Sequence, residues 1–380
     1  MLVAANLRPA VVAVAPLIDE IKASTGWSSG VAGLLTSLPV LVFGLTAPLA
    51  PRVAGRFGIE RSVFGSLAVL VVAILIRLVP HPAALFGGSA LVGAGIGICN
   101  VVLPSLIKRD FAHRSGLMTG LYSMTLSSGA AVTAGLAVPI NDAVGGNWRV
   151  ALAAWALPVL VALAVWTTQL RRMHRIEVAA PASSLWRNPL AWAITVFMAT
   201  QALIFFTFAA WLPEFLIDRG MSAAAAGAVL AAAQVAAMVL SLVAPVVAGR
   251  FRDQRVVTMV TLGVCAVGFV GLTCTDRWPV LWSVCVASGP GAAVGLAFLF
   301  MVLRSTSTAQ TSQVSGMAQS VGYLVPAVGP VAIGALHDVT GSWPIAMGAL
   351  GFALIPQAWS ARVAGRDSTM PEAGVTAAAR

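Results

Sequence analysis

The sequence predicts an all-α membrane protein of twelve transmembrane helices in two pseudo-symmetric six-helix halves. Composition is the first observation behind this prediction, because 59% of the 380 residues are hydrophobic and only 9% are charged, which leaves too little polar surface for an aqueous exterior. The second is an internal repeat. The octapeptide at residues 50–57 returns 194 positions later at residues 244–251 with seven of eight residues identical, which indicates a duplicated chain.

The individual helices follow from the apolar runs, since a transmembrane helix needs about 20 apolar residues. Twelve segments qualify: residues 2–21, 28–50, 62–80, 83–106, 115–140, 148–169, 189–216, 222–248, 255–273, 279–303, 312–335 and 343–361. They predict an N-terminal half at residues 1–170, a cytoplasmic linker at 171–187, a C-terminal half at 188–361 and a flexible cytoplasmic tail at 362–380. Duplicated six-helix halves are typical of transporters with a site near the midplane.

The positive charges predict the orientation in the membrane. Seventeen Lys and Arg residues fall in the loops after the second, fourth, eighth and tenth spans, in the linker after the sixth span and in the tail, whereas five fall on the opposite side. Cytoplasmic loops are enriched in Lys and Arg, so we expect both termini in the cytoplasm of a multi-pass inner (plasma) membrane protein. The net charge of +10 therefore reflects orientation, and no nucleic-acid partner is expected.

The first helix contains the most informative residue, Arg8, about 16 Å along the helix from Asp19 at 1.5 Å per residue. A charge at this depth costs about 2.5 kcal/mol or more and normally faces an interior pathway. Pro9 and Pro16 interrupt the hydrogen-bond ladder beside it. The alternative is that Arg8 reaches back to the cytoplasmic surface.

No carboxylate accompanies Arg8, since all 13 acidic residues lie at predicted helix ends, in loops or in the tail. A buried cation without an acidic partner favours an anionic or strongly dipolar ligand. Other polar side chains at plausible depth complete the expected substrate site, although each could instead hydrogen-bond between helices. The expected substrate-binding residues are Arg8, Asn6, Asn100, Tyr122, Gln201, Gln319 and Tyr323.

The repeated octapeptide closes the second and eighth helices on the cytoplasmic side. Gly55 and Gly249 are expected to permit tight turns there, and the arginines to contact headgroups or helix ends. We expect conformational roles for Arg56, Gly58, Arg61 and Arg250. The alternative is that these arginines only fix orientation.

The first copy resembles the Gly-x-x-x-Asp-Arg-x-Gly signature of the major facilitator superfamily, with Gly55 at the position of the Asp. Further motifs resemble the cyanate permease family within that superfamily: residues 6–9, 16–21, 97–104, 108–111, 118–124, 315–323 and 335–338. The resemblance implies the major facilitator fold and an inner-membrane permease for small solutes, with members associated with cyanate uptake and nitroimidazole export. It marks Arg8 as the anion partner, with Asn100, Tyr122, Gln319 and Tyr323 as site residues.

We therefore expect a secondary active or facilitative transporter that moves a small anionic or strongly dipolar, cyanate-like solute by alternating access. The alternative is an exporter of uncharged aromatic compounds such as nitroimidazole-like drugs. We expect a monomer in the lipid bilayer, with no cofactor, no bound metal and no enzyme activity. The four cysteines lack metal-ligand spacing and are expected to be buried apolar residues.

Overall fold

The computed structural model describes residues 1–171 and 182–371, and these residues form helices without strands. Contacts divide the chain into two compact units. Unit 1 comprises Met1–Leu106 and Thr125–Ala179, and unit 2 comprises Ile107–Met124 and Ala180–Arg380. Most of the expected linker lies outside the described residues, although its end forms the 3₁₀ helix η5 (Ala182–Arg187).

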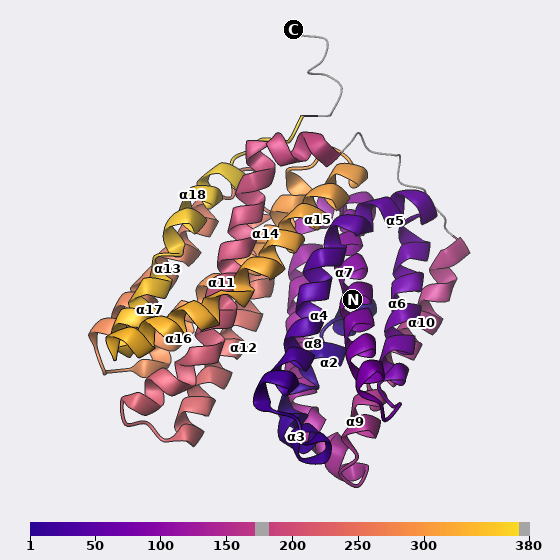
Figure 1. The fold of residues 1–380 in the computed structure, drawn as a ribbon. Coiled ribbons are helices and arrows are strands. Elements are labelled where there is room, and N and C mark those ends of the chain that lie inside the picture. The colour runs from indigo at the N-terminus through magenta and orange to yellow at the C-terminus, as the bar shows by residue number, and fades with distance from the viewer. Residues whose placement is uncertain (172–181, 372–380) are drawn as a thin grey trace. The chain divides into compact units, whose positions relative to one another are not determined.

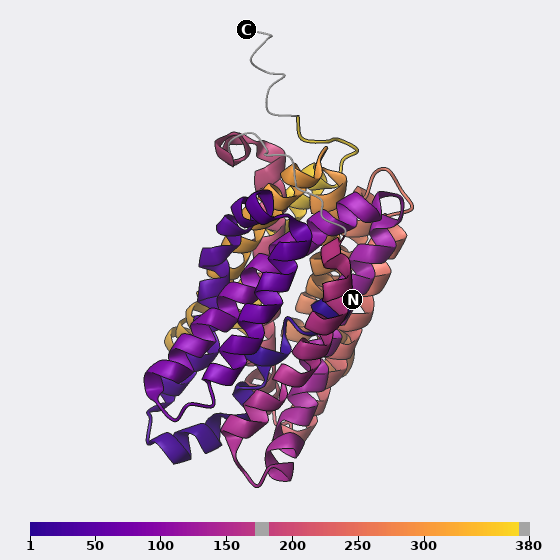
Figure 2. The same ribbon diagram turned by 90° about the vertical axis from the view of Figure 1, so that its right-hand side faces the viewer.

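Unit 1 is built from the N-terminal helices, and its core includes Leu17, Ile21, Leu35 and Trp148. Glycines in α7 bring neighbouring helices into backbone contact. A Cβ at Gly93 would lie 2.2 Å from the Pro39 carbonyl oxygen of α4, and one at Gly95 would lie 3.0 Å from the Ser66 carbonyl oxygen of α6. The three helices run side by side in both views (Figures 1 and 2). The elements of unit 1 are α1 (Leu2–Ala5), α2 (Pro9–Val12), η1 (Ala15–Leu17), α3 (Ile18–Thr25), α4 (Ser29–Thr46), η2 (Ala47–Leu49), α5 (Ala50–Phe57), α6 (Ile59–Ile76), α7 (Pro82–Asp110) to Leu106, α8 (Ser115–Ala143) from Thr125, α9 (Trp148–Ala154), α10 (Ala156–Trp166) and η4 (Thr167–Arg171).

Unit 2 is organised around α14 (Pro279–Leu303), which packs against α12 and α13 (Figure 1). Gly291 and Gly295 permit this packing, because a Cβ at either would lie within 2.5 Å of a backbone atom of α12. Small residues at such contacts are typical of helices in lipid, where close packing replaces the hydrophobic effect. The other elements are η3 (Ala112–Arg114), the start of α8, α11 (Pro189–Asp218), α12 (Ala223–Ala248), α13 (Arg255–Cys274), α15 (Thr308–Leu324), η6 (Val325–Ala327), α16 (Gly329–Thr340), α17 (Trp343–Gly351) and α18 (Leu354–Ala364).

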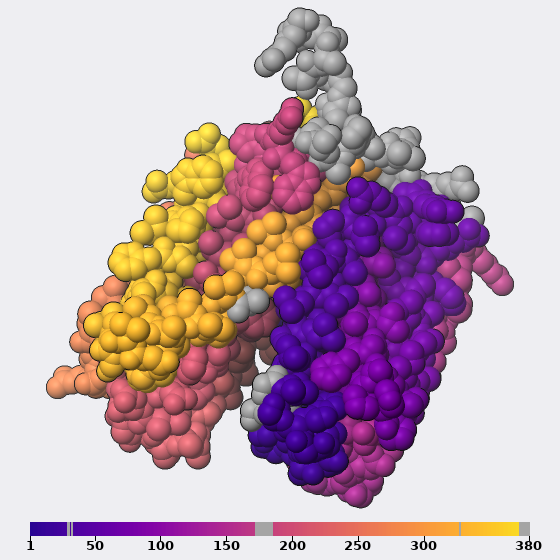
Figure 3. All heavy atoms as spheres, viewed as in Figure 1, coloured from indigo at the N-terminus to yellow at the C-terminus, as the bar shows by residue number. Residues whose placement is uncertain are grey.

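Eleven helical stretches of the described residues are long and apolar enough to cross a membrane. The twelfth expected span is present as α17 and α18, with an interruption at Phe352 and Ala353. Pro356 has no N–H to donate to the Phe352 carbonyl, and the Ile355 N–H donates to that carbonyl instead at 3.0 Å. Large apolar side chains such as Ile355 are exposed along α18, which the space-filling view shows in yellow (Figure 3).

The duplication is visible in matching local structures. Gly26 and Gly220, 194 positions apart, both adopt left-handed backbone angles, with φ of 69° and 85°. Two residues later, Ser28 and Ser222 cap α4 and α12, their hydroxyl oxygens accepting backbone N–H bonds at 3.4 and 3.3 Å. Such serines satisfy N–H groups that a helix start leaves unpaired. Equivalent sequence positions therefore begin equivalent helices in the two units.

The expected turn at Gly55 is wrong, because Gly55 lies inside α5. The turn after the first octapeptide falls at Gly58, with a φ of 86°. Gly249 does lie in a turn directly after α12, with a φ of −65° that any residue can adopt. Its hydrogen side chain also permits a close approach in unit 2, because a Cβ on it would lie 2.7 Å from the Cα of Gly116.

The described part of the expected flexible tail, residues 362–371, has a defined structure. Helix α18 continues to Ala364, and the Met370 side chain is fully buried. Residues 372–380 lie outside the described residues.

Candidate functional site

The first membrane span is broken at Asn6, Leu7 and Arg8, between α1 and α2. Pro9 explains the break, because it has no N–H to donate to the Ala5 carbonyl. The Asn6 and Leu7 N–H groups make short-range bonds to the Val3 and Ala4 carbonyls at 3.0 and 3.2 Å. Irregular backbone inside a membrane protein is tolerated where protein buries it or where it lines a cavity.

Neighbouring groups stabilise this break. The Asn6 side chain, which is 2% exposed, donates through Nδ2 to the Leu2 carbonyl at 2.9 Å. Helix α8 approaches through Gly129, where a Cβ would lie only 2.5 Å from the Ala5 carbonyl oxygen. Asn6 therefore supports its own turn, and its amide nitrogen is occupied by a local hydrogen bond.

Arg8 is half-buried and occupies the N-cap position of α2, where its side chain makes no capping hydrogen bond. Among residues 1–171 and 182–371, its guanidinium forms no ion pair or side-chain hydrogen bond. A partly buried cation without an acidic partner is a costly arrangement in a membrane protein. A guanidinium without an acidic partner has N–H groups that can donate to an anion.

Asn100 lies in α7, also in unit 1, and is 1% exposed. It follows a glycine run that allows close helix packing: a Cβ at Gly97 would lie 2.4 Å from the Thr46 hydroxyl oxygen of α4. The glycines before Asn100 therefore allow close helix approach.

The remaining expected substrate-binding residues lie in unit 2. The Tyr122 ring stacks edge-on against Phe298, with ring centroids 4.9 Å apart. On α11, Gln201 Nε2 lies 3.4 Å from the Met198 sulfur. On α15, Gln319 Nε2 donates to the Ser315 hydroxyl at 2.7 Å.

Helices α11 and α15 approach each other at Gly322. A Cβ at Gly322 would lie 2.8 Å from the Cγ of Met198. Tyr323 is 5% exposed and Gln201 is 4% exposed. The structure places Asn6, Arg8 and Asn100 in unit 1, whereas the other four expected residues belong to unit 2.

Three of the residues expected to act in conformational change are exposed, namely Arg56, Arg61 and Arg250. None of them forms an ion pair with another described residue. The Arg56 guanidinium lies 5.4 Å from the centroid of the Phe57 ring. Gly58 is buried and supplies the turn between α5 and α6.

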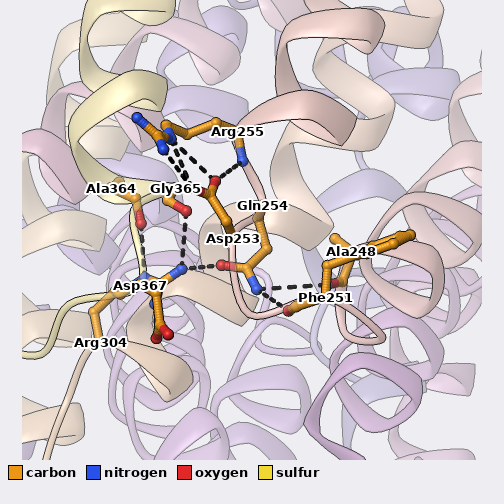
Figure 4. Close-up of polar contacts among 9 residues, drawn as sticks. All are labelled: Ala248, Phe251, Asp253, Gln254, Arg255, Arg304, Ala364, Gly365 and Asp367. Carbon is orange, nitrogen blue, oxygen red and sulfur yellow. Dashed lines mark hydrogen bonds and ion pairs between the residues drawn. The ribbon is translucent and has the colours of Figure 1, made fainter.

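Sequence reasoning assigned Arg304 to a cytoplasmic loop, but the structure buries it at 2% exposure. Arg304 follows α14, and its Nε donates to the Ala364 carbonyl at 2.8 Å (Figure 4). Its Nη2 donates to the Gly365 carbonyl at 3.2 Å and to Gln254 Oε1, and its Nη1 lies 4.0 Å from an Asp367 carboxylate oxygen. Burial lowers the pKa of Arg304, and Asp367 opposes that shift. One buried cation thus joins the end of α18 to the loop before α13.

Residues 365–371, the C-terminal strap, are fixed by the same network. The Met370 N–H donates to the Arg304 carbonyl at 2.8 Å, and Gln310 Nε2 donates to the Pro371 carbonyl at 3.1 Å. No sequence pattern predicts this arrangement, because a cation at the end of an apolar run is ordinarily solvated.

The described residues contain no cluster of three or more metal-ligating side chains. Cys99 and Cys265 are buried, as expected, and Cys285 is partly buried. Cys274 differs from the expectation, because it lies at the exposed end of α13.

Comparisons with known proteins agree with this architecture. The family model described as "Major Facilitator Superfamily" matches residues 10–330. The 2-nitroimidazole transporter of Escherichia coli (strain K12) is 38% identical over 97% of this chain and 94% of its own length. The cyanate transport protein CynX of the same strain is 32% identical over 90% of each chain. Among solved structures, the E. coli fucose:proton symporter FucP (N162A) has a TM-score of 0.75 and 11% identity over 96% of this chain and 98% of its own, a similarity of fold.

Proposed function

Because the chain belongs to the major facilitator superfamily of membrane transporters, we propose that it moves a small anionic or strongly dipolar, cyanate-like solute across the inner membrane by alternating access. The single observation that carries this proposal is the half-buried Arg8 at the broken first helix, without an acidic partner among the described residues. The name of the relative CynX, a cyanate transport protein, supports the same solute class.

Arg8 would attract the negative end of the solute, because a guanidinium presents several N–H donors to an anion. Exchange of access between the two sides is the mechanism that duplicated transporter halves support. We place both termini in the cytoplasm on the basis of the positive charges.

A second candidate is export of uncharged aromatic compounds. The edge-on pair of Tyr122 and Phe298 favours it, because aromatic side chains stack on planar ligands. The relative named as a 2-nitroimidazole transporter supports this class. The two candidates differ in whether Arg8 contributes to recognition.

Transport in proteoliposomes tests the choice, with cyanate and 2-nitroimidazole each supplied as solute. Loss of a hydrogen bond to a charged group costs about 1.5–3 kcal/mol, so Arg8→Ala is expected to raise the KM for cyanate by about 10- to 150-fold. Arg277→Ala is the matched control, because Arg277 is exposed. Cyanate transport by Arg8→Ala at the level of Arg277→Ala would contradict the proposal. Loss of 2-nitroimidazole transport on replacing Phe298, with Arg8 dispensable, would support the second candidate.

A further inference from the structure

Arg77 is a second buried cation in unit 1. It directly follows α6, near the outer end of the expected span 62–80, yet it is only 1% exposed. An arginine side chain stays positively charged at neutral pH even when it is buried. No acidic side chain of the described residues forms an ion pair with it.

The Arg77 guanidinium contacts the first membrane span just after the break. Its Nη1 donates to the Ala10 carbonyl at 2.7 Å. In a regular helix this carbonyl would accept the N–H of Val14, but that N–H instead makes a long bond of 3.4 Å to the Val11 carbonyl. Arg77 therefore takes the place of the missing backbone donor.

The other guanidinium nitrogens indicate a role beyond stability. Nε and Nη2 of Arg77 are buried and have no hydrogen-bond partner among the described residues. Burying unpaired donors is unfavourable, and an apolar side chain of similar volume is often at least as stable at such a position. Packing fixes the side chain further, because a Cβ at Gly88 of α7 would lie 2.9 Å from the Arg77 Cγ.

We propose that Arg77 is a positioning residue that holds the broken first helix in the geometry from which Arg8 recognises the solute. Ala10 is two residues from Arg8, and Pro9 between them has a restricted backbone. A shift of the Ala10 carbonyl therefore moves the backbone that carries Arg8. This inference rests on the proposed function, and two separate readouts test it.

The first readout is amide hydrogen exchange over residues 11–14 in purified protein, which needs no solute. Arg77→Met removes the donor and is expected to increase exchange at Val14 at least tenfold, whereas Arg77→Lys, which keeps a charged donor, is expected to stay close to the parent. Arg219→Met is the matched control. Arg219 also donates to helix-end carbonyls, with Nη1 2.7 Å from the Leu272 carbonyl oxygen, but it lies in unit 2. Unchanged exchange at Val14 in Arg77→Met would overturn the proposal.

The second readout is the KM for cyanate in proteoliposomes. Arg77→Met is expected to raise the KM about tenfold at an unchanged melting temperature, and Arg77→Lys is expected to keep the KM close to the parent value. Arg219→Met is expected to lower the melting temperature without changing the KM. A purely structural role would instead lower the melting temperature of Arg77→Met and leave KM at the parent value, which would overturn the proposal. Normal cyanate transport by Arg8→Ala would overturn the proposed function, whereas the exchange readout would still report whether Arg77 holds the break.

Discussion

Replacing Arg304 by methionine is expected to release the C-terminal strap. The substitution keeps much of the buried volume but removes the donors to the Ala364 carbonyl and to Gln254 Oε1, which have no other donor among the described residues. The Gly365 carbonyl retains the Gln254 N–H at 2.9 Å. Two buried acceptors are therefore left unsatisfied, each costing about 1–3 kcal/mol.

The loss is expected near the lower limit, about 2 kcal/mol in total, because the strap lies beside solvent-exposed groups. The Asp367 side chain is 60% exposed and 4.0 Å from Arg304, and exposed ion pairs contribute at most about 1 kcal/mol. A loss of 2 kcal/mol increases local opening about 30-fold.

Hydrogen exchange at the Met370 amide measures this opening, because that N–H is bonded to the Arg304 carbonyl. Arg366→Met is the matched control, since Arg366 lies in the same strap and is exposed. Exchange at Met370 no faster in Arg304→Met than in Arg366→Met would refute this account of the strap.

Three further predictions follow from single contacts. Gly129→Ala is expected to destabilise unit 1 by about 1–3 kcal/mol, because its Cβ would meet a backbone carbonyl at 2.5 Å. Gly135→Ala on the same helix is the control, because its Cβ would meet open space. Equal melting temperatures of the two variants would contradict this prediction. Cys274 is exposed at the expected outer end of α13, so it is expected to react with a membrane-impermeant maleimide in intact cells. A Cys274→Ser chain provides the blank. Reaction only after cell lysis would reverse the predicted orientation. Hydrogen bonds from Arg255 lower the pKa of the Asp253 carboxyl, so the pair stabilises the protein above the ordinary carboxyl pKa of about 3.9 and loses that effect as the pH falls through the lowered pKa. Asp253→Asn should therefore slightly lower the melting temperature at neutral pH but not in strong acid. A difference in melting temperature that does not depend on pH would argue against the pair.

Much of the fold could be predicted from the sequence, because both the membrane spans and the duplication leave local signals. Ser28 and Ser222 begin matching helices since capping depends on residues adjacent in the chain. Pro9 likewise predicted a disturbed first helix. The interruption of the last span at Phe352 was missed, although Pro356 was a usable signal.

The polar network could not be predicted in this way. Arg77 and Arg304 stand at the ends of apolar runs, where sequence patterns indicate solvated charges. Their burial depends on carbonyls 67 and 60 residues away in the chain, those of Ala10 and Ala364. Such pairings are set by tertiary packing, and hydropathy contains no information about them.

The contact between Gly116 and Gly249 also limits the substitutions that these two positions can accept. A Cβ on Gly116 would lie 2.9 Å from the Cα of Gly249, and the reverse distance is 2.7 Å. Because backbone atoms meet backbone atoms, a smaller partner residue cannot restore the space lost to a methyl group. In a saturation library, both positions should retain glycine alone, and no second-site exchange between them should rescue a variant.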